Sequence, residues 1–430
     1  MPLSTGLSDP GYTKPRIAPL RMTLREFFAA FVLFVTNAGR AGAETQTFNL
    51  ATESAFTSER GHGFDLGTAP DAAGKLFYFS VALPEGSYRV IVTFGDAHAA
   101  SDNTIKAESR QLMLEHVTTT PGESVTRSFL VNVRNSRIPP PEKNAPGGSA
   151  VVLNEGETGL LRWDDKLTLE FNGPAPRVSA VAIEKVDVPV IYLAGDSTVT
   201  DQPYEPGASW GQMLPRFLAG VAVANHAESG ETMKSFISGL RLAKVLSQLK
   251  PGDWLFLQFG HNDEKKQWPQ TYVEAHTTYK AYLKAYIAEA RLHGATPVLV
   301  TSMQRRNFDA QGKIRNTHGD YPQAVREVAA EEKVALIDLE RMSVAFYEAL
   351  GREKAPLAFS AGGKDVTHHD NYGAYELAKC VVQGIRDAQL PLAQFIVPDF
   401  AGFDPAHPDD PTAFILAPSP QRSDVTPRGS

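Results

Sequence analysis

The feature that most constrains the fold of this chain is a change in the spacing of its apolar residues at about Pro189. Beyond that point, continuous apolar runs, typical of strands covered on both faces, alternate with helical segments. The five runs are 190–194, 221–225, 254–260, 296–302 and 334–338. The clearest helical segments are 271–292, which is followed by a His293-Gly294 stop signal, and one that follows Asn371. This alternation predicts a doubly wound α/β domain with a parallel sheet over residues 189–390.

Before Pro189 the spacing is that of strands, without a sustained helical stripe. Residues 87–96 alternate in the manner of a half-buried strand and follow the turn signal Pro84-Glu85-Gly86. Other short strand-like segments are 76–83, 111–117, 125–133, 150–153, 166–171 and 178–186. They predict an antiparallel β-sandwich over residues 44–188. The sequence rich in Pro and Asp near the C-terminus predicts an irregular tail at 391–430.

The N-terminal sequence has the order of a secretory signal. A basic segment that starts at Met22 precedes the apolar run 27–35, and small residues follow up to Ala43. This order predicts translation from Met22, cleavage after Ala43, and a secreted or periplasmic protein. The apolar run is too short for a stable membrane span, and a buried core helix is the alternative.

Composition excludes some classes of partner and site. The net charge of −7 and the absence of a dense Lys/Arg run argue against a nucleic-acid partner. The single cysteine, Cys380, excludes an intrachain disulfide and a Cys-based zinc site.

Polar residues follow the predicted parallel strands, at the edge where an open sheet binds its ligands. Ser197, in Gly195-Asp196-Ser197-Thr198, leaves the first strand. It is a candidate nucleophile, although Asp196 or Ser197 could instead cap a helix. Gly230 follows the second strand and Asn262 the third, and both could donate to an oxyanion. An ordinary loop glycine and a strand-end turn are the alternatives.

Asp365 and His368 form the last candidate pair, after the fifth strand. An Asp three residues before a His on a loop can hold one ring nitrogen while the other ring nitrogen faces a serine. Solvated loop histidines, or a zinc site that also uses His369 and Asp370, are the alternatives. The spacing from Asp365 favours His368 over His369.

These four blocks resemble those of the SGNH (GDSL-like) hydrolases. The match looks closest to the rhamnogalacturonan acetylesterases, which the segments 209–214, 305–308 and 365–374 also resemble. The sandwich resembles the galactose-binding-type accessory domain of some bacterial members. One departure is Glu231-Thr232 after Gly230, where the family often has a basic residue and Ser or Thr.

The resemblance implies a role for each candidate. Ser197 would be the nucleophile, His368 the base and Asp365 the residue that orients it. The backbone N–H groups of Ser197 and Gly230 and the side-chain amide of Asn262 would form the oxyanion hole. No metal or organic cofactor would be needed.

The implied function is that of a secreted serine esterase which deacetylates a plant cell-wall polysaccharide or its oligosaccharides, with rhamnogalacturonan or pectin as the expected polymer. Arg305 and Arg306 follow the fourth strand and could pair with a uronic acid carboxylate, or be solvated surface charges. A lipase or lysophospholipase, an acetylxylan esterase and a catalytically inactive polysaccharide-binding protein are the alternatives.

Overall fold

The computed structural model describes residues 45–139, 147–423, 425, 427 and 428, and it contains three β-sheets. The predicted signal segment, with Met22 and the cleavage site after Ala43, lies outside the described residues.

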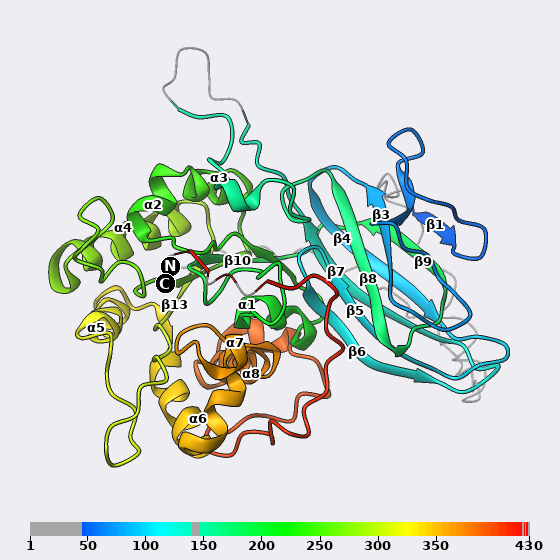
Figure 1. The fold of residues 1–430 in the computed structure, drawn as a ribbon. Coiled ribbons are helices and arrows are strands. Elements are labelled where there is room, and N and C mark those ends of the chain that lie inside the picture. Colours follow the sequence, from blue (N-terminus) through cyan, green and yellow to red (C-terminus); the bar gives the residue numbers. More distant parts are fainter. Residues whose placement is uncertain (1–44, 140–146, 424, 426, 429–430) are drawn as a thin grey trace, which may run out of the picture. The chain divides into compact units, whose positions relative to one another are not determined.

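The parallel sheet is the element that positions the candidate residues (Figure 1). Its strands are β10 (Val190–Gly195), β11 (Ala222–Asn225), β12 (Trp254–Gln258), β13 (Thr296–Val300) and β14 (Ala335–Ile337). They are ordered β11-β10-β12-β13-β14, and all neighbours are parallel. The strand order changes direction between β10 and β12, so polar residues at the carboxyl ends of these strands border a natural ligand site. The predicted α/β fold is confirmed.

Helices cover both faces of this sheet, which explains the continuous apolar runs. Along β10, Val190, Tyr192 and Ala194 pack into one core, whereas Ile191 and Leu193 pack into the other. The first core is covered by α2 (Met233–Ser238), α3 (Arg241–Gln248), the π-helical turn Ala275–Tyr279 with α4 (Lys280–Leu292), and α5 (Tyr321–Glu332). The second core is covered by α1 (Trp210–Met213), α6 (Leu339–Lys354) and α8 (Asn371–Asp387). Short helices at Leu214–Phe217, Ala355–Ala358, α7 (Ser360–Gly363) and Pro391–Phe395 complete this part.

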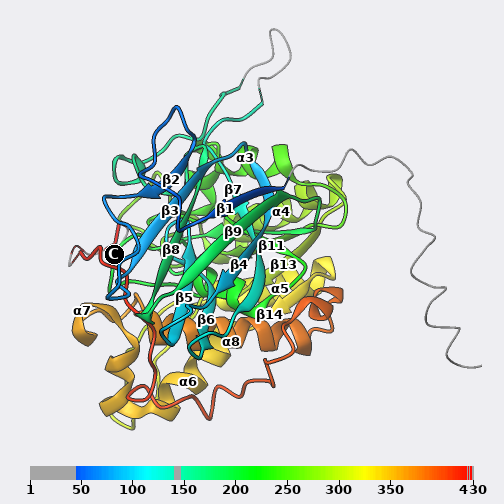
Figure 2. The same cartoon turned by 90° about the vertical axis from the view of Figure 1, so that its right-hand side faces the viewer.

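The preceding region is an antiparallel sandwich, seen face-on in Figure 2. One sheet has the order β1-β9-β4-β7 and the other β2-β3-β8-β5-β6. The strands are β1 (Gln46–Asn49), β2 (His62–Asp65), β3 (Phe77–Ala82), β4 (Gly86–Phe94), β5 (Ser101–Ala107), β6 (Gln111–Thr119), β7 (Val125–Val133), β8 (Lys166–Ala175) and β9 (Val178–Lys185). A short helix at Glu155–Glu157 lies between β7 and β8. The inward side chains form one core, to which Phe79, Phe94 and Phe171 contribute.

The sandwich differs from the sequence prediction in several strands, and β1 and β2 were not among the predicted ones. Residues 150–153 form no strand, because Ala150 only makes an isolated bridge with Arg137 on a loop. β5 was not predicted, because its sequence is mostly polar. Its buried Asn103 is satisfied by donating to the Ser101 hydroxyl and the Val117 carbonyl.

Charged side chains buried at the junction tie the sandwich to the α/β domain. Arg110 in the turn after β5 pairs with Glu205, with 2.6 Å between Nη2 and Oε1. The C-terminal tail joins the same junction, since the Lys106 ammonium donates to the Ala417 carbonyl and the Ser419 hydroxyl. Apart from isolated bridges, the described residues after Phe395 belong to no helix or strand.

We expect Lys106→Met to lower the free energy of unfolding by about 3–5 kcal/mol. The Lys106 side chain is 2% exposed, and its ammonium lies 3.5 Å from Glu170 and 3.9 Å from Glu205, so its removal leaves buried carboxylates less well paired. Urea unfolding measures the change. Lys75→Met is the control, because Lys75 makes an exposed pair with Asp71 and should matter little. Equal effects of the two substitutions would contradict this account of the junction.

Candidate active site

Ser197 lies in a tight turn at the carboxyl end of β10. The Asp196 carboxylate accepts hydrogen bonds from the Thr198 backbone N–H at 2.9 Å and from its hydroxyl at 2.8 Å, which fixes the turn. The next helix along the chain is α1, and its N-cap is Ser209. Ser197 is therefore not the cap of the following helix, and its hydroxyl is directed elsewhere.

The Ser197 hydroxyl is within hydrogen-bond distance of a histidine that is itself held by a carboxylate. His368 Nε2 lies 2.9 Å from Ser197 Oγ, and His368 Nδ1 lies 2.8 Å from Asp365 Oδ2. The other Asp365 oxygen accepts the backbone N–H groups of Thr367 and His368 at 2.7 and 2.9 Å. A proton on Nδ1 is thereby directed at Asp365, which leaves Nε2 able to accept the serine proton.

Asp365 is held in its ionised form. Burial alone would raise the pKa of this carboxyl, but the hydrogen bonds and charge interaction with His368 outweigh burial and lower the pKa below its usual range. A carboxylate at this position stabilises a positive charge that develops on the imidazole.

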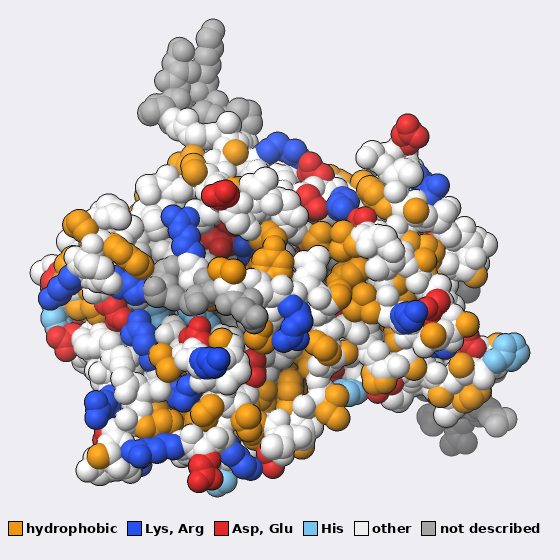
Figure 3. Space-filling view, in the orientation of Figure 1, with side chains coloured by type: hydrophobic (Ala, Val, Ile, Leu, Met, Phe, Trp, Pro, Cys, Tyr) orange, Lys and Arg blue, Asp and Glu red, His pale blue; other side chains and the backbone are white. Residues whose placement is uncertain are grey.

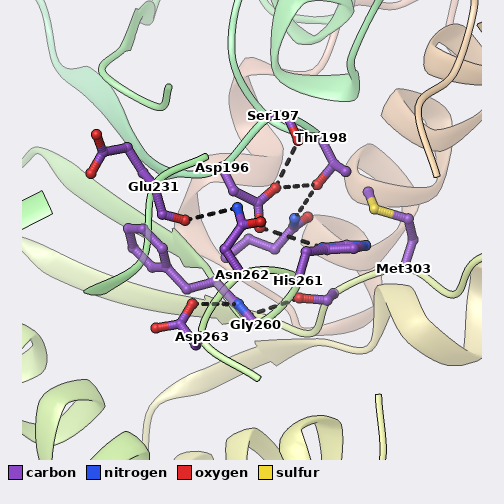
Figure 4. Close-up of polar contacts among 12 residues, drawn as sticks. Asp196, Ser197, Thr198, Glu231, Gly260, His261, Asn262, Asp263 and Met303 are labelled. Carbon is purple, nitrogen blue, oxygen red and sulfur yellow. Dashed lines mark hydrogen bonds and ion pairs between the residues drawn. The ribbon is translucent and has the colours of Figure 1, made fainter. Parts of the chain in front are cut away.

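Two candidate donors lie on neighbouring loops that are bonded to each other (Figure 4). Gly230 follows β11 and has a φ of +83°, a conformation that favours glycine. The Asn262 side-chain amide donates to the Glu231 carbonyl at 3.1 Å, which uses one of its two hydrogens. The adjacent Asp263 carboxylate accepts the backbone N–H of Met233 at 2.9 Å and that of Gly260 at 3.1 Å. These bonds fix the loop after β12 against the start of α2.

The structure separates the two adjacent histidines. The His369 ring lies 2.7 Å from the Tyr347 hydroxyl through Nε2, and it packs against Phe359 with 4.5 Å between ring centroids. Burial lowers the pKa of His369 to about 3, so this side chain stays neutral. Burial likewise lowers the pKa of His261 to about 4, although the Asp196 carboxylate opposes that shift.

Arg305 and Arg306 are both bonded to groups of the protein itself. Arg305 Nη2 lies 2.7 Å from Glu264 Oε1 and 3.3 Å from the His261 carbonyl oxygen. Arg306 donates to the carbonyl oxygens of Gly363 and Asp365, and therefore supports the loop that carries Asp365.

Several residues that position the Ser197 turn were not predicted. The Gln202 amide donates to the Ser197 carbonyl at 2.7 Å. The Trp210 indole N–H donates to the side-chain oxygen Oε1 of Gln258 at 2.8 Å, and the side-chain N–H of Gln258 donates to Thr198 Oγ1 at 2.7 Å. The Ser-Trp-Gly-Gln segment at 209–212 is the sequence feature that could have indicated a role for Trp210. Gln258 lies within an apolar run, and no sequence feature indicated its role.

A cavity of about 270 Å³ lies beside Asp365. Its wall combines sandwich residues such as Asn154 and Leu160, α/β residues such as Tyr204, and the tail residue Arg428. On the face drawn in Figure 3, apolar side chains gather where the sandwich meets the α/β domain. Ser197 itself is only 4% exposed.

The described residues contain no group of three or more His, Cys, Asp or Glu side chains that could hold a metal ion. Within the same residues, no helix is long and apolar enough to span a membrane.

Comparison with known proteins identifies the family. Residues 193–374 match the GDSL-like lipase/acylhydrolase family. The chain is also 45% identical over 213 residues to the probable rhamnogalacturonan acetylesterase YesY of Bacillus subtilis, a match that covers 48% of this chain and 97% of YesY. The chain belongs to the GDSL-like family. It is therefore a carboxylic ester hydrolase.

Two further relatives from Bacillus subtilis differ in how much of the chain they match. The rhamnogalacturonan acetylesterase RhgT is 40% identical over 221 residues, covering 48% of this chain and 94% of RhgT. The uncharacterized esterase YxiM is 26% identical over 375 residues, covering 81% of this GDSL-like chain and 89% of YxiM. The YxiM match is longer than residues 189–430, so it extends into the sandwich.

The neutral His369 predicts a dependence of stability on pH. Because its folded pKa is about 3 and its usual value is 6.5, the unfolded chain binds more protons between these values. The contribution is complete above pH 6.5 and is lost as the pH falls below it. We expect the stability advantage of wild type over His369→Gln to shrink by about 2 kcal/mol between pH 7.5 and pH 5, measured by urea unfolding. A constant difference would show that His369 titrates alike in both states.

Proposed function

We propose that this chain is a secreted serine esterase that removes acetyl groups from a plant cell-wall polysaccharide, with rhamnogalacturonan as the polymer. The observation that carries the proposal is the contact of Ser197, His368 and Asp365 at the carboxyl edge of the sheet. The choice of polymer is supported by the names of YesY and RhgT, which are 45% and 40% identical to this chain over 213 and 221 residues.

In the acylation step, His368 Nε2 takes the Ser197 proton as Oγ attacks the acetyl carbonyl carbon. The carbonyl π electrons move to oxygen and form a tetrahedral oxyanion. The Asp365 carboxylate stabilises the imidazolium that results. When the tetrahedral species collapses, the bond to the sugar oxygen breaks and His368 gives that oxygen its proton.

We assign the oxyanion to three donors: the backbone N–H groups of Ser197 and Gly230, and the Asn262 side-chain amide. Their support is the arrangement of the two loops, since the Asn262 amide also holds Glu231, the residue after Gly230. Fixed donors aimed at developing charge stabilise a transition state without reorganisation.

In the deacylation step, water takes the place of the serine hydroxyl. His368 removes a proton from this water, which attacks the acetyl-Ser197 ester. Collapse of the second tetrahedral species releases acetate and returns the proton from His368 to Ser197. Both steps use only groups of the chain, the ester and water.

We expect Ser197→Ala to fold with an unchanged thermal unfolding midpoint and to lose acetate release by at least about a thousandfold. The alanine keeps the backbone N–H but removes the attacking oxygen. Enzymatic detection of acetate released from acetylated rhamnogalacturonan measures the loss. Wild-type release by the variant would end the serine esterase proposal.

The adjacent histidines offer a matched pair of substitutions. We expect His368→Gln to lose kcat by a similar factor to Ser197→Ala while remaining folded. His369→Gln should keep kcat and lower the unfolding temperature instead, because His369 contacts Tyr347 in the core. The opposite pattern, with kcat lost only in His369→Gln, would show that His369 is the base and that the assignment to His368 is wrong.

The polymer is tested with the whole chain on a panel of acetylated rhamnogalacturonan, acetylated xylan and long-chain acyl esters. We expect kcat/KM to be highest on rhamnogalacturonan and lowest on long-chain esters. A preference for xylan would contradict only the proposed polymer. A preference for long acyl chains would contradict the proposed acetylesterase activity and indicate a lipase.

A further inference from the structure

A loop of the sandwich reaches the segment that carries Gly230. This loop includes Glu157 and Arg162, which are 1% and 2% exposed. Buried charges of this kind are tolerated only when they are paired and hydrogen-bonded. Their partners therefore define which part of the α/β domain the sandwich holds.

Arg162 contacts the two loops that follow β10 and β11. One guanidinium nitrogen donates to the Thr200 hydroxyl at 2.9 Å and to the Asp201 carbonyl at 2.7 Å. The other pairs with the Glu228 carboxylate. Glu228 also accepts the Ser229 backbone N–H through its other oxygen, at 2.8 Å. Arg162 thus fixes the residues that immediately precede Gly230.

Glu157 reaches the other side of Gly230 through Arg241 at the start of α3. Its carboxylate pairs with Arg241, and Arg241 Nε lies 3.4 Å from Glu231 Oε1. Glu157 also lies 3.8 Å from Arg162, which joins the two halves of this arrangement.

The five side chains form a series in which acidic and basic groups alternate, which we call the charge ring. Its members are Glu228, Arg162, Glu157, Arg241 and Glu231. The loop 228–231 closes the ring, and Gly230 lies within that loop. All five side chains are at most 9% exposed, so water replaces little of what they supply to one another.

We propose that Arg162 is a positioning residue for catalysis, so that the sandwich is a structural part of the active site rather than a separate sugar-binding module. Through the charge ring, Arg162 holds the Gly230 N–H where the oxyanion forms. This inference rests on the proposed esterase function.

The test compares two substitutions that each break an ion pair between the sandwich and the α/β domain. Arg162→Met opens the charge ring. Arg216→Met is the control, because Arg216 pairs at 2.7 Å with Glu115 of β6, outside the ring. Both are made in the full chain and assayed on a small acetyl ester.

We expect Arg162→Met to lower kcat about ten- to hundredfold with KM changed less than threefold, since loss of a whole oxyanion donor costs about 10²–10³ in kcat. Arg162→Lys should recover part of the loss. Adding Glu228→Gln to Arg162→Met should cost little more, because the two substitutions break the same pair. Arg216→Met should keep kcat and lower only the unfolding midpoint.

Amide hydrogen exchange supplies a readout that does not depend on activity. We expect exchange across 228–232 to accelerate at least about tenfold in Arg162→Met and to stay unchanged in Arg216→Met. If Arg162→Met keeps wild-type kcat and exchange, or if Arg216→Met lowers kcat equally, the positioning role is wrong. If the wild type is inactive, or if Ser197→Ala is active, the esterase proposal is refuted instead. The exchange result then tests only whether Arg162 holds residues 228–232 in place.

Discussion

Charges buried between the sandwich and the α/β domain have to find partners, because a charge removed from water loses several kcal/mol of hydration free energy. Arg110 therefore pairs with Glu205, and Arg162 pairs with Glu228. Each pair joins a residue of the sandwich to a loop at the carboxyl edge of the parallel sheet. The two parts of the chain are consequently held in one arrangement, and the candidate active site lies next to these contacts.

The carboxyl edge of the parallel sheet explains why residues far apart in the sequence meet. Ser197 follows β10, Gly230 follows β11 and Asn262 follows β12, and these strands are neighbours. Asp365 and His368 come from the loop before α8, which brings the imidazole to the serine hydroxyl. An acyl transfer requires a nucleophile, a base and oxyanion donors within a few ångströms, and the sheet supplies positions for all three.

The sequence was sufficient for the parts of the fold that depend on local pattern. The parallel strands were predicted because each is buried on both faces, and α8 because its apolar residues share one face. β5 escaped prediction because the burial of Asn103 and Lys106 depends on partners distant in sequence. For the same reason, the sequence offered no signal for the contact of Arg162 with Glu228. Asp365 and His368, in contrast, are only three positions apart in the sequence, so their contact could be predicted.

The central claim, that Ser197 is the nucleophile, is tested most directly by labelling with an organophosphorus ester that reacts with activated serines. The account predicts that one equivalent abolishes deacetylation and that peptide mass spectrometry finds the label on Ser197. Complete inactivation with the label on another residue, and none on Ser197, would contradict it.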